Sequence, residues 1–586
     1  MKKSLSLLLI LVGSHCFSQS VSYELSMPKP QNHYFHVEMT LKDFKEKSLD
    51  VSLPVWIPGS YLIREFSKNI NLVKAFGENG EPLKVKKKSK NTWCISKGKQ
   101  KKVTIKYEVY SFELSVRTSF LDLTHGFVSG SGVFMFVEKH KDISGQLNIV
   151  PYEGFSKIST SLPLKDGSKE YTYSFSDYDQ LVDCPIEIGN HELIEFEAAG
   201  VNHSVAMFGS GNYFVEDIIF DLSKIIEEET KVFGQNPNKN YLFIVHNVVN
   251  GQGGLEHTNS TTLSVNRWTY GGSNYVKFLN LVAHEYFHLW NVKRIRPIEL
   301  GPFDYNKENY TDLLWVMEGF TSYYDELILQ RAGYYTQSQF LNKLQGSINY
   351  VEGSVGSRVQ PVAHASYDAW IKSYRPNENS PNTTMSYYSR GSVIAALLDI
   401  MIITHSDGKK CLDHFMQSLY ENFYVKKNRG FTSKEFKSEL EVFVGKNLDE
   451  FYEKYIDGTE IPPYKEIFGL VGLDVNDASS TYPDFGAQLR SSGGKTIIKS
   501  IRSGSAAEDA GLSVNDEIIA CNGYRVDKAD IESIMKELLE GDSIDLLISR
   551  DEILFSVNFT MTNRTKNKFY LNVSDENDKL YNYWLR

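Results

Sequence analysis

The chain has 586 residues, with 63 lysines and arginines against 73 aspartates and glutamates, so its formal net charge is −10. Its 41 % apolar, 23 % charged and 13 % aromatic residues exclude a disordered chain, a collagen and a disulfide scaffold. The acidic balance counts against nucleic-acid binding, which needs a basic face. Lysines that cluster within residues 84–102 are interpreted as solvated charges of strands and hairpins.

Residues 1–18 have the pattern of a signal peptide. Lys2 and Lys3 form a short basic start, and residues 4–12 are an apolar stretch that is too short to span a membrane. Small residues before Gln19 favour cleavage at that point. We therefore expect an exported protein that is periplasmic or secreted.

A lipoprotein anchored through Cys16 is the alternative, and His15 disfavours it because a small residue is needed there. The apolar run at 393–403 is interpreted as a buried helix, so no transmembrane segment is expected. The other cysteines show no CxxC spacing, and their pairing is left open: Cys94, Cys184, Cys411 and Cys521.

The patterning predicts a multidomain α+β protein. Apolar and polar residues alternate at 34–41 and 102–107, which is typical of half-buried strands. Helical periodicity begins near residue 205 and is clear over 215–233. From about residue 483, short strands, two helices and an Asn522-Gly523 turn form a compact α+β module. The expected divisions are a signal peptide (1–18), an N-terminal β-rich domain (19–200), a mostly α catalytic domain (201–470), the small module (480–563) and a C-terminal tail (564–586).

Two histidines stand four residues apart in a helical context, at His284 and His288. Side chains at i and i+4 share one helix face, so both imidazoles can bind one zinc ion. Glu285 lies beside them and is a candidate general base. The alternative, two surface histidines flanking a glutamate, is disfavoured by the other motifs.

A catalytic zinc needs a third protein ligand, and Glu318 is the candidate. It stands in an apolar and aromatic helical stretch, where a bare carboxylate is costly to bury unless it has a partner. Zinc is one such partner, and an arginine is the alternative.

Two further segments add candidate substrate contacts. Gly253 and Gly254 border a short edge strand that could align an extended peptide, and Glu256 on that strand could hold a free α-ammonium group. The segment 386–391 opens an apolar helix with two tyrosines, and a hydroxyl there could donate a hydrogen bond to an oxyanion. Taken alone, a segment of either kind more often has a structural role than a role in substrate binding or catalysis.

Together these motifs resemble the aminopeptidases of the gluzincin class, which share His-Glu-x-x-His, a later Glu-Gly-Phe, an upstream Gly-Gly-x-Glu and a downstream Tyr-x-x-Gly. The sequence at 284–297 is similar to the signature of the glycyl aminopeptidase family. The segments 56–61 and 455–460 resemble that family as well. The module at 480–563 resembles a circularly permuted PDZ domain, so the resemblance covers nearly the whole mature chain.

The resemblance implies a thermolysin-like catalytic domain, one zinc ion per chain, and removal of N-terminal glycine and alanine. By motif, His284, His288 and Glu318 correspond to the zinc ligands and Glu285 to the general base. Glu256 corresponds to the residue that recognises the amine. The Tyr-x-x-Gly spacing selects Tyr388 over Tyr387 as the transition-state donor. The chain departs from the broader pattern in two respects: His257 replaces an asparagine, and a longer insertion separates His288 from Glu318.

Three alternatives remain. A zinc endopeptidase could use the PDZ domain to capture substrates. A PDZ-bearing binding protein could carry an inactive enzyme domain. A hydrolase of epoxides or other small molecules could use the same fold. Peptide substrates are the expected partners, together with protein C-termini bound by the PDZ domain, while the oligomeric state and side-chain preference stay open.

Overall fold

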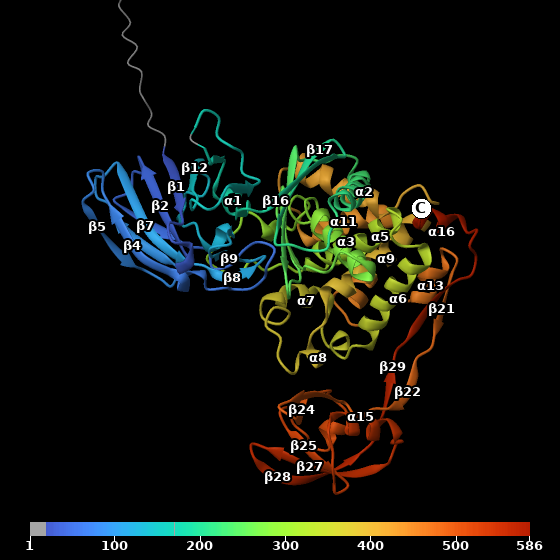
Figure 1. Ribbon diagram of the computed structural model, residues 1–586. Helices are drawn as coiled ribbons and strands as arrows, with labels where there is room; N and C mark the ends of the chain where they lie inside the picture. Colours follow the sequence, from blue (N-terminus) through green and yellow to red (C-terminus); the bar gives the residue numbers. More distant parts are fainter. Residues whose placement is uncertain (1–18, 169) are drawn as a thin grey trace, which may run out of the picture. The chain divides into compact units, whose positions relative to one another are not determined.

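The computed structural model describes residues 19–168 and 170–586 and divides into two compact units (Figure 1). Unit 1 comprises the residues up to 55 together with 65–190, and unit 2 comprises 56–64 and 191–586. The predicted signal peptide and its alternative, an anchor at Cys16, lie outside the described residues.

Unit 1 is the predicted β-rich domain. Its strands form a ten-stranded sheet in the order β11-β3-β6-β5-β4-β7-β2-β1-β12-β14 and a five-stranded sheet in the order β13-β15-β10-β9-β8. Alternate residues of β2 are buried, as the alternation at 34–41 predicts. The elements are β1 Ser20–Ser26, β2 Tyr34–Lys42, β3 Ser48–Ser52, β4 Ile70–Phe76, β5 Pro82–Lys87, β6 Thr92–Ser96, β7 Lys102–Tyr110, β8 Phe112–Ser115, β9 Thr118–Leu121, β10 His125–Val128, β11 Phe136–Val137, β12 Gly145–Val150, β13 Lys157–Thr160, β14 Thr172–Phe175, α1 Tyr178–Val182 and β15 Ile186–Gly189.

Unit 2 begins with a five-stranded sheet in the order β16-β17-β18-β20-β19. β17, β18 and β20 are parallel, and the edge strands β16 and β19 run antiparallel to their neighbours. β16 pairs with β17, so the unit starts near residue 191, earlier than the boundary expected at 200. The bounds are β16 Glu192–Ala198, β17 Val201–Phe208, β18 Asn240–Val248, β19 Gly254–Glu256 and β20 Ser260–Asn266.

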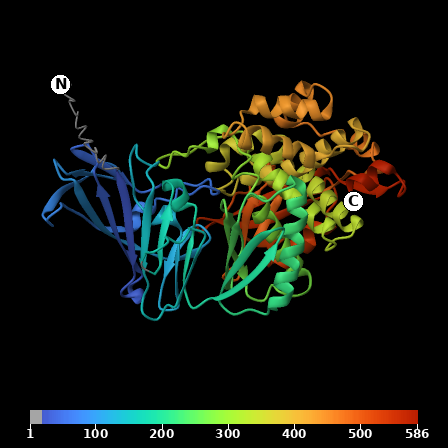
Figure 2. The same ribbon diagram turned by 90° about the horizontal axis from the view of Figure 1, so that it is seen from above.

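Helices cover this sheet and form the rest of the body of unit 2. α2 and α3 lie against the sheet, α5 packs on α3, and α9 packs on α5 (Figures 1 and 2). The helices are α2 Val215–Phe233, α3 Gly272–Phe287, α4 Leu314–Met317, α5 Gly319–Arg331, α6 Gln337–Gly353, α7 Val362–Tyr367, α8 Ser380–Thr383, α9 Tyr387–His405, α10 Leu412–Leu419, α11 Ser433–Val444, α12 Asp449–Phe451 and α13 Tyr464–Gly469.

The apolar run at 393–403 lies in α9. The stretch Ser380–His405 is long and apolar enough to cross a membrane by composition, but 83 % of its apolar window is buried inside the protein. It therefore serves as a core helix of unit 2, in agreement with the interpretation from sequence. Within residues 19–168 and 170–586 no disulfide links the four cysteines, and all but Cys94 are buried.

The C-terminal module contains the sheet β23-β24-β25-β27-β28 with α15, around an apolar core that includes Ile498, Ile518 and Leu546. Two-stranded ribbons, β21 with β30 and β22 with β29, connect it to the helical body (Figure 1). The elements are β21 Leu473–Asp477, β22 Ser480–Pro483, β23 Ala487–Ser492, β24 Lys495–Ile501, α14 Ala506–Asp509, β25 Glu517–Cys521, β26 Tyr524–Arg525, α15 Lys528–Glu537, β27 Ser543–Arg550, β28 Ile553–Thr560, β29 Asn563–Lys566, β30 Phe569–Val573 and α16 Lys579–Trp584.

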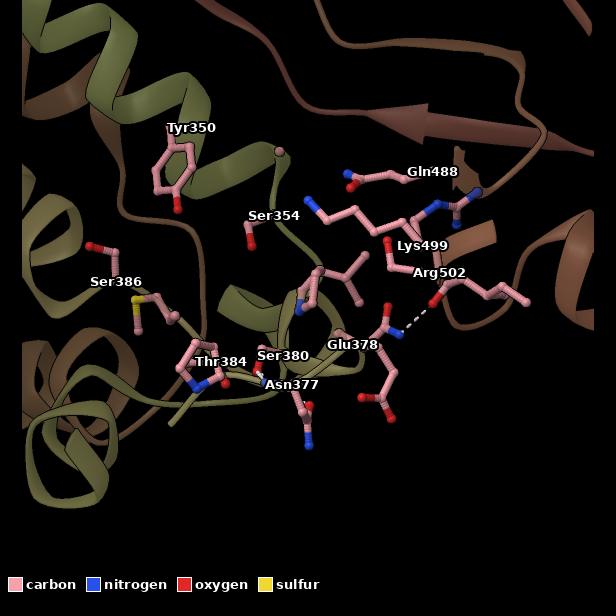
Figure 3. A pocket seen from close by; sticks show the side chains of 18 of the residues that line it. Tyr350, Ser354, Asn377, Glu378, Ser380, Thr384, Ser386, Gln488, Lys499 and Arg502 are labelled. Carbon is pink, nitrogen blue, oxygen red and sulfur yellow. Dashed lines mark hydrogen bonds between the residues drawn. The ribbon is translucent and has the colours of Figure 1, made fainter. Parts of the chain in front are cut away.

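The C-terminal tail returns to the helical body. The buried indole of Trp584 donates a hydrogen bond to the hydroxyl of Tyr323 at 2.7 Å, and α16 packs on α9. The end of β24 also reaches the body, because the amide of Asn382 donates to the carbonyl of Ile501 at 2.7 Å. The next residue, Arg502, is labelled in Figure 3.

Candidate metal centre and substrate site

The three predicted metal ligands converge. His284 lies in the last turns of α3, His288 follows that helix, and Glu318 lies at the junction of α4 and α5. Oε2 of Glu318 is 3.4 Å from Nε2 of His284 and 3.3 Å from Nε2 of His288. Ligand bonds of about 2.0–2.2 Å in a tetrahedral site place neighbouring donor atoms roughly 3.3–3.6 Å apart. The side chains as they stand therefore fit a zinc ion.

Each histidine is oriented by its other ring nitrogen. Nδ1 of His284 lies 2.9 Å from Oδ2 of Asp325, and Asn280 donates to the other oxygen of that carboxylate at 3.0 Å. Nδ1 of His288 donates to the carbonyl of Asn291 at 2.6 Å. Such partners fix the ring so that Nε2 faces the metal. Sequence reasoning missed Asp325, although it stands two helical turns after Glu318 on the same helix face.

The charges of the site favour a bound cation. Burial alone would raise the pKa of Glu318, but the two imidazoles hold it at about 2. Burial lowers the pKa of His284, yet Asp325 and Glu318 outweigh that effect and raise it well above its usual value. The carboxylates thus stabilise positive charge among them, as a divalent metal requires.

The general-base candidate, Glu285, faces the same space. Burial raises its pKa to about 7, with Glu256 and Glu318 adding to the effect and the imidazoles opposing it. A Cβ on Gly254 would lie 2.2 Å from Oε1 of Glu285, so the glycine makes room for this carboxylate against β19. This contact gives Gly254 a physical role, while Gly253 supplies a backbone with φ of +108° just before the strand.

Glu256 extends from β19 toward the same centre. Donor oxygens of Glu256 and Glu285 and a ring nitrogen of His288 all lie within 4.8 Å of one another. Among the described residues, Oε1 of Glu256 and Oε2 of Glu285 are buried without a hydrogen-bond partner. A buried unpaired carboxylate is costly, and an ammonium group from a ligand would satisfy it.

A turn far away in the sequence closes the site beside Glu256. The amide of Ser60 donates to the carbonyl of Ile57 at 3.1 Å, and Gly59 has φ of +86°. A Cβ on Gly59 would lie only 2.5 Å from Oε1 of Glu256. The turn thus brings backbone directly against the carboxylate, which no side chain at this position would allow.

Aromatic side chains anchor this turn to unit 2. The ring of Tyr61 lies 5.6 Å from that of Trp370 and 6.0 Å from that of Tyr374, and the indole of Trp56 donates to the carbonyl of Asp304 at 2.8 Å. Burial, and then the charges of Glu318 and Glu256, raise the pKa of Tyr61 well above its usual value. The Pro58-Gly59 turn was visible in the sequence, but its partner was not.

The helices that carry Glu318 and Tyr388 approach each other through two glycines. A Cβ on Gly319 would lie 2.4 Å from the Cα of Gly391, and one on Gly391 would lie 2.2 Å from the carbonyl of Trp315. Backbone contact between α5 and α9 requires glycine at both positions. This close contact explains why Glu318 and Tyr388 each stand near a glycine in the sequence.

Tyr388 lies in the first turn of α9, whose N-cap is Ser386. Its ring centre is 6.3 Å from that of His284, and its side chain is partly exposed, while Tyr387 is fully buried. Burial, and then the charge of Glu318, raise the pKa of Tyr388 well above its usual value. The hydroxyl therefore keeps its proton and can donate a hydrogen bond.

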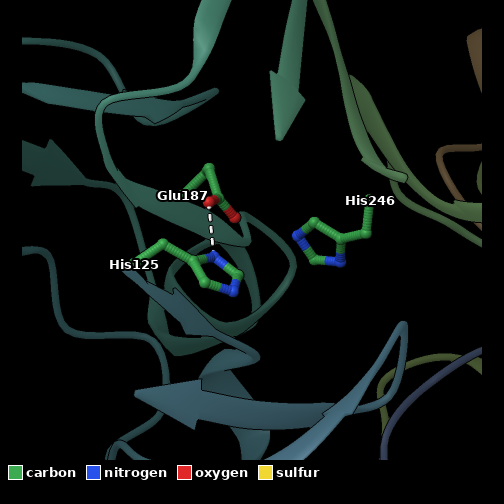
Figure 4. Close-up of side chains that lie close together, drawn as sticks. All are labelled: His125, Glu187 and His246. Carbon is green, nitrogen blue, oxygen red and sulfur yellow. Dashed lines mark hydrogen bonds and ion pairs between the residues drawn. The ribbon is translucent and has the colours of Figure 1, made fainter. Parts of the chain in front are cut away.

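Unit 1 contains a separate buried pair. Nδ1 of His125 on β10 lies 2.8 Å from Oε1 of Glu187 on the neighbouring β15 (Figure 4). Both side chains are almost completely buried. The contact gives each polar group a partner inside the sheet.

Comparisons with known proteins match three parts of the chain to family models. Residues 22–190 match a peptidase M61 N-terminal domain, 277–394 match M61 glycyl aminopeptidase, and 475–549 match a PDZ domain. No curated protein matches the chain. An aminopeptidase N family protein from Idiomarina loihiensis has a similar structure, with a TM-score of 0.89 and 31 % identity over 97 % of this chain and 100 % of that one. An M1 zinc metallopeptidase from Deinococcus radiodurans, at 13 % identity over 76 % of this chain and 95 % of that one, has a TM-score of 0.50 and shares the fold.

Proposed function

Because the chain belongs to the M61 glycyl aminopeptidase family of peptidases, we propose that it is a zinc-dependent aminopeptidase that removes N-terminal residues, glycine and alanine foremost. The observation that carries the proposal is the position of Glu256, a buried carboxylate with an unpartnered oxygen among the described residues, beside the three-ligand centre. A peptidase site with a built-in acceptor for an ammonium group favours substrates with a free amino terminus.

Each residue of the site has a role in this proposal. A zinc ion held by His284, His288 and Glu318 would polarise the scissile carbonyl and lower the pKa of water. Glu285 accepts a proton from the attacking water and delivers it to the leaving amine. Tyr388 donates a hydrogen bond to the developing oxyanion.

The turn at 57–60 supports removal of single residues from the amino terminus. Its backbone at Gly59 stands against the carboxylate of Glu256, so space beyond a bound ammonium group is occupied by the protein. The neighbouring rings of Tyr61, Trp370 and Tyr374 restrict the adjoining volume. Both features favour a short, small first residue.

We predict that Glu256→Ala raises KM for free-amine substrates by roughly 10- to 100-fold, because hydrogen bonds to a charged group contribute about 1.5–3 kcal/mol. Steady-state kinetics with glycine and alanine amides measure this change. Zinc content should match the parent protein, since Glu256 is not among the proposed ligands. An unchanged KM would contradict its role in binding the ammonium group.

We predict that Gly59→Ala also raises KM for free-amine substrates, because the added methyl group would displace the carboxylate of Glu256. Gly80→Ala is the matched control. Gly80 has φ of +83° and open space around its Cβ position, so it shares the backbone strain without the contact. A rise in KM that is equal in both variants would assign the effect to strain or folding and contradict the proposed contact.

We also propose that the protein is exported, since residues 1–18 carry the pattern of a cleavable signal. Sequencing the amino terminus of protein recovered from the native host tests this proposal. A mature protein that begins at Gln19 is expected, and one that retains residues 1–18 would contradict it.

A further inference from the structure

A large basic cavity lies between the PDZ domain and the helical body of unit 2. It encloses about 980 Å³ and is bounded on one side by β24 and the start of β23, and on the other by the segment 372–386 and the end of α6 (Figure 3). This volume is in the range of sites that hold drug-sized ligands or several residues of a peptide.

The two walls of the cavity are fixed to each other by hydrogen bonds. The amide of Asn382 donates to the carbonyl of Ile501, and its oxygen accepts from the backbone amide of Ser503 at 3.0 Å. On the opposite side, the guanidinium of Arg564 donates to the carbonyl of Gly353 at 2.8 Å. The cavity is therefore a defined part of unit 2.

The charge of the lining is strongly positive, although the whole chain is acidic. Five cationic side chains line the cavity against a single carboxylate, that of Glu378. Arg502 is paired with Asp484, and the ammonium of Lys372 is 3.7 Å from Asp368, so these two are partly neutralised. Across residues 19–168 and 170–586, no carboxylate lies within 4.0 Å of the ammonium groups of Lys499 or Lys566.

Two segments that line the cavity continue toward the metal centre. Lys372, Ser373 and Pro376 line the cavity, while Tyr374 of the same segment lies beside Tyr61 at the metal centre. The segment 384–386, which also lines the cavity, leads directly into the helix that begins with Tyr387 and Tyr388. A peptide with its amino terminus at Glu256 can thus extend toward the cavity along these segments.

We propose that this cavity binds acidic groups of the peptide substrate, at residues beyond the cleaved bond, through Lys499 and Lys566. The inference rests on the proposed peptidase function and adds a charge preference to it. Both lysines are exposed, and together with the other cations of the lining they give the cavity a positive potential that attracts carboxylates. Gln488 at the edge strand β23 also lines the cavity, and a strand edge can align an extended peptide.

The test uses the zinc-loaded full chain and pairs of glycine-initiated peptides that differ only by Glu or Gln at one position. At one or more positions beyond the cleaved bond, we expect kcat/KM for the Glu peptide to exceed that for the Gln peptide by at least about fivefold. Two ion pairs with exposed lysines contribute about 1 kcal/mol, which corresponds to this ratio. In Lys499→Glu/Lys566→Glu this ratio should fall to one or below. Lys465→Glu/Lys536→Glu changes the net charge equally at exposed lysines elsewhere in unit 2 and should keep the parent ratio.

A second measurement does not depend on turnover. Binding of a fluorescent, N-acetylated acidic peptide should weaken at least about fivefold in the cavity variant and at high salt. A Glu:Gln ratio near one at every position in the parent, or a ratio equal in both double variants, would overturn the inference while leaving the peptidase proposal intact. Inorganic phosphate and the unlabelled peptide should be compared, at equal ionic strength, as competitors of the fluorescent peptide. If phosphate displaces it as strongly as the unlabelled peptide does, the peptide assignment is wrong. Failure of the parent to hydrolyse any of the peptides would instead contradict the proposed function.

Discussion

Glu285→Gln is expected to lower kcat for glycine amides by about 10²- to 10⁴-fold, the range typical of a lost general base, while the protein keeps one zinc ion per chain. Glutamine occupies the same space against Gly254 but cannot accept the proton. The predicted metal ligands do not include this residue, so zinc affinity should be nearly unchanged. Metal analysis and kinetics of the same preparation measure both effects.

Glu318→Ala provides the contrasting variant. It removes the only carboxylate of the three-ligand group, whose oxygen lies 3.4 Å and 3.3 Å from the two imidazole nitrogens, and should lose zinc and activity together. Circular dichroism distinguishes metal loss from unfolding. Equal zinc loss in both variants would contradict the assignment of ligand and base.

Tyr388→Phe is expected to lower kcat and kcat/KM together by roughly 10²- to 10³-fold, with KM little changed, as happens when one oxyanion donor is removed. The neighbouring Tyr387→Phe is the control, because that side chain is completely buried while Tyr388 is partly exposed. If kcat falls strongly in Tyr387→Phe but not in Tyr388→Phe, the oxyanion donor is Tyr387 and the assignment of Tyr388 is wrong. Parent rates in both variants would remove tyrosine from the mechanism.

The proximity of the two histidines could be predicted from sequence because helix geometry alone brings residues i and i+4 together. His284 and His288 need no knowledge of the rest of the fold, and Glu318 was found because an apolar context makes a lone carboxylate conspicuous. The family resemblance is confirmed by the matches to its N-terminal, aminopeptidase and PDZ models. Alternation and turn signals predict the β-rich domain, whereas the PDZ module follows from its resemblance to that family and not from turn signals alone.

The sheet that carries Glu256 was harder to predict. β18 is buried along almost its whole length, so it reads as an apolar run without alternation, as is usual for parallel strands covered on both faces. Residues 192–198, which form β16, precede the first helical periodicity, so the sequence pattern groups them with the strands of the domain before. Only the short edge strand β19 was expected, because glycines border it.

Contacts between distant segments lay beyond sequence reasoning. Gly59 and Glu256 are almost 200 residues apart, and nothing in either segment identifies the other. The same holds for Trp584 against Tyr323. It also holds for the basic cavity, where Lys499 and Lys566 come from β24 and β29 while the opposite wall comes from residues 372–386. Only the folded chain brings such groups together.

The most direct test of the account is the hydrolysis of a fluorogenic glycine amide and its N-acetylated counterpart by the chelated and the zinc-restored protein. We expect the chelated protein to be inactive and one equivalent of zinc to restore cleavage of the free amine. The acetylated substrate should stay poor because it offers Glu256 no ammonium group to bind. Full activity after chelation would contradict a zinc-dependent mechanism, and equal rates with both substrates would contradict an aminopeptidase and favour the endopeptidase alternative.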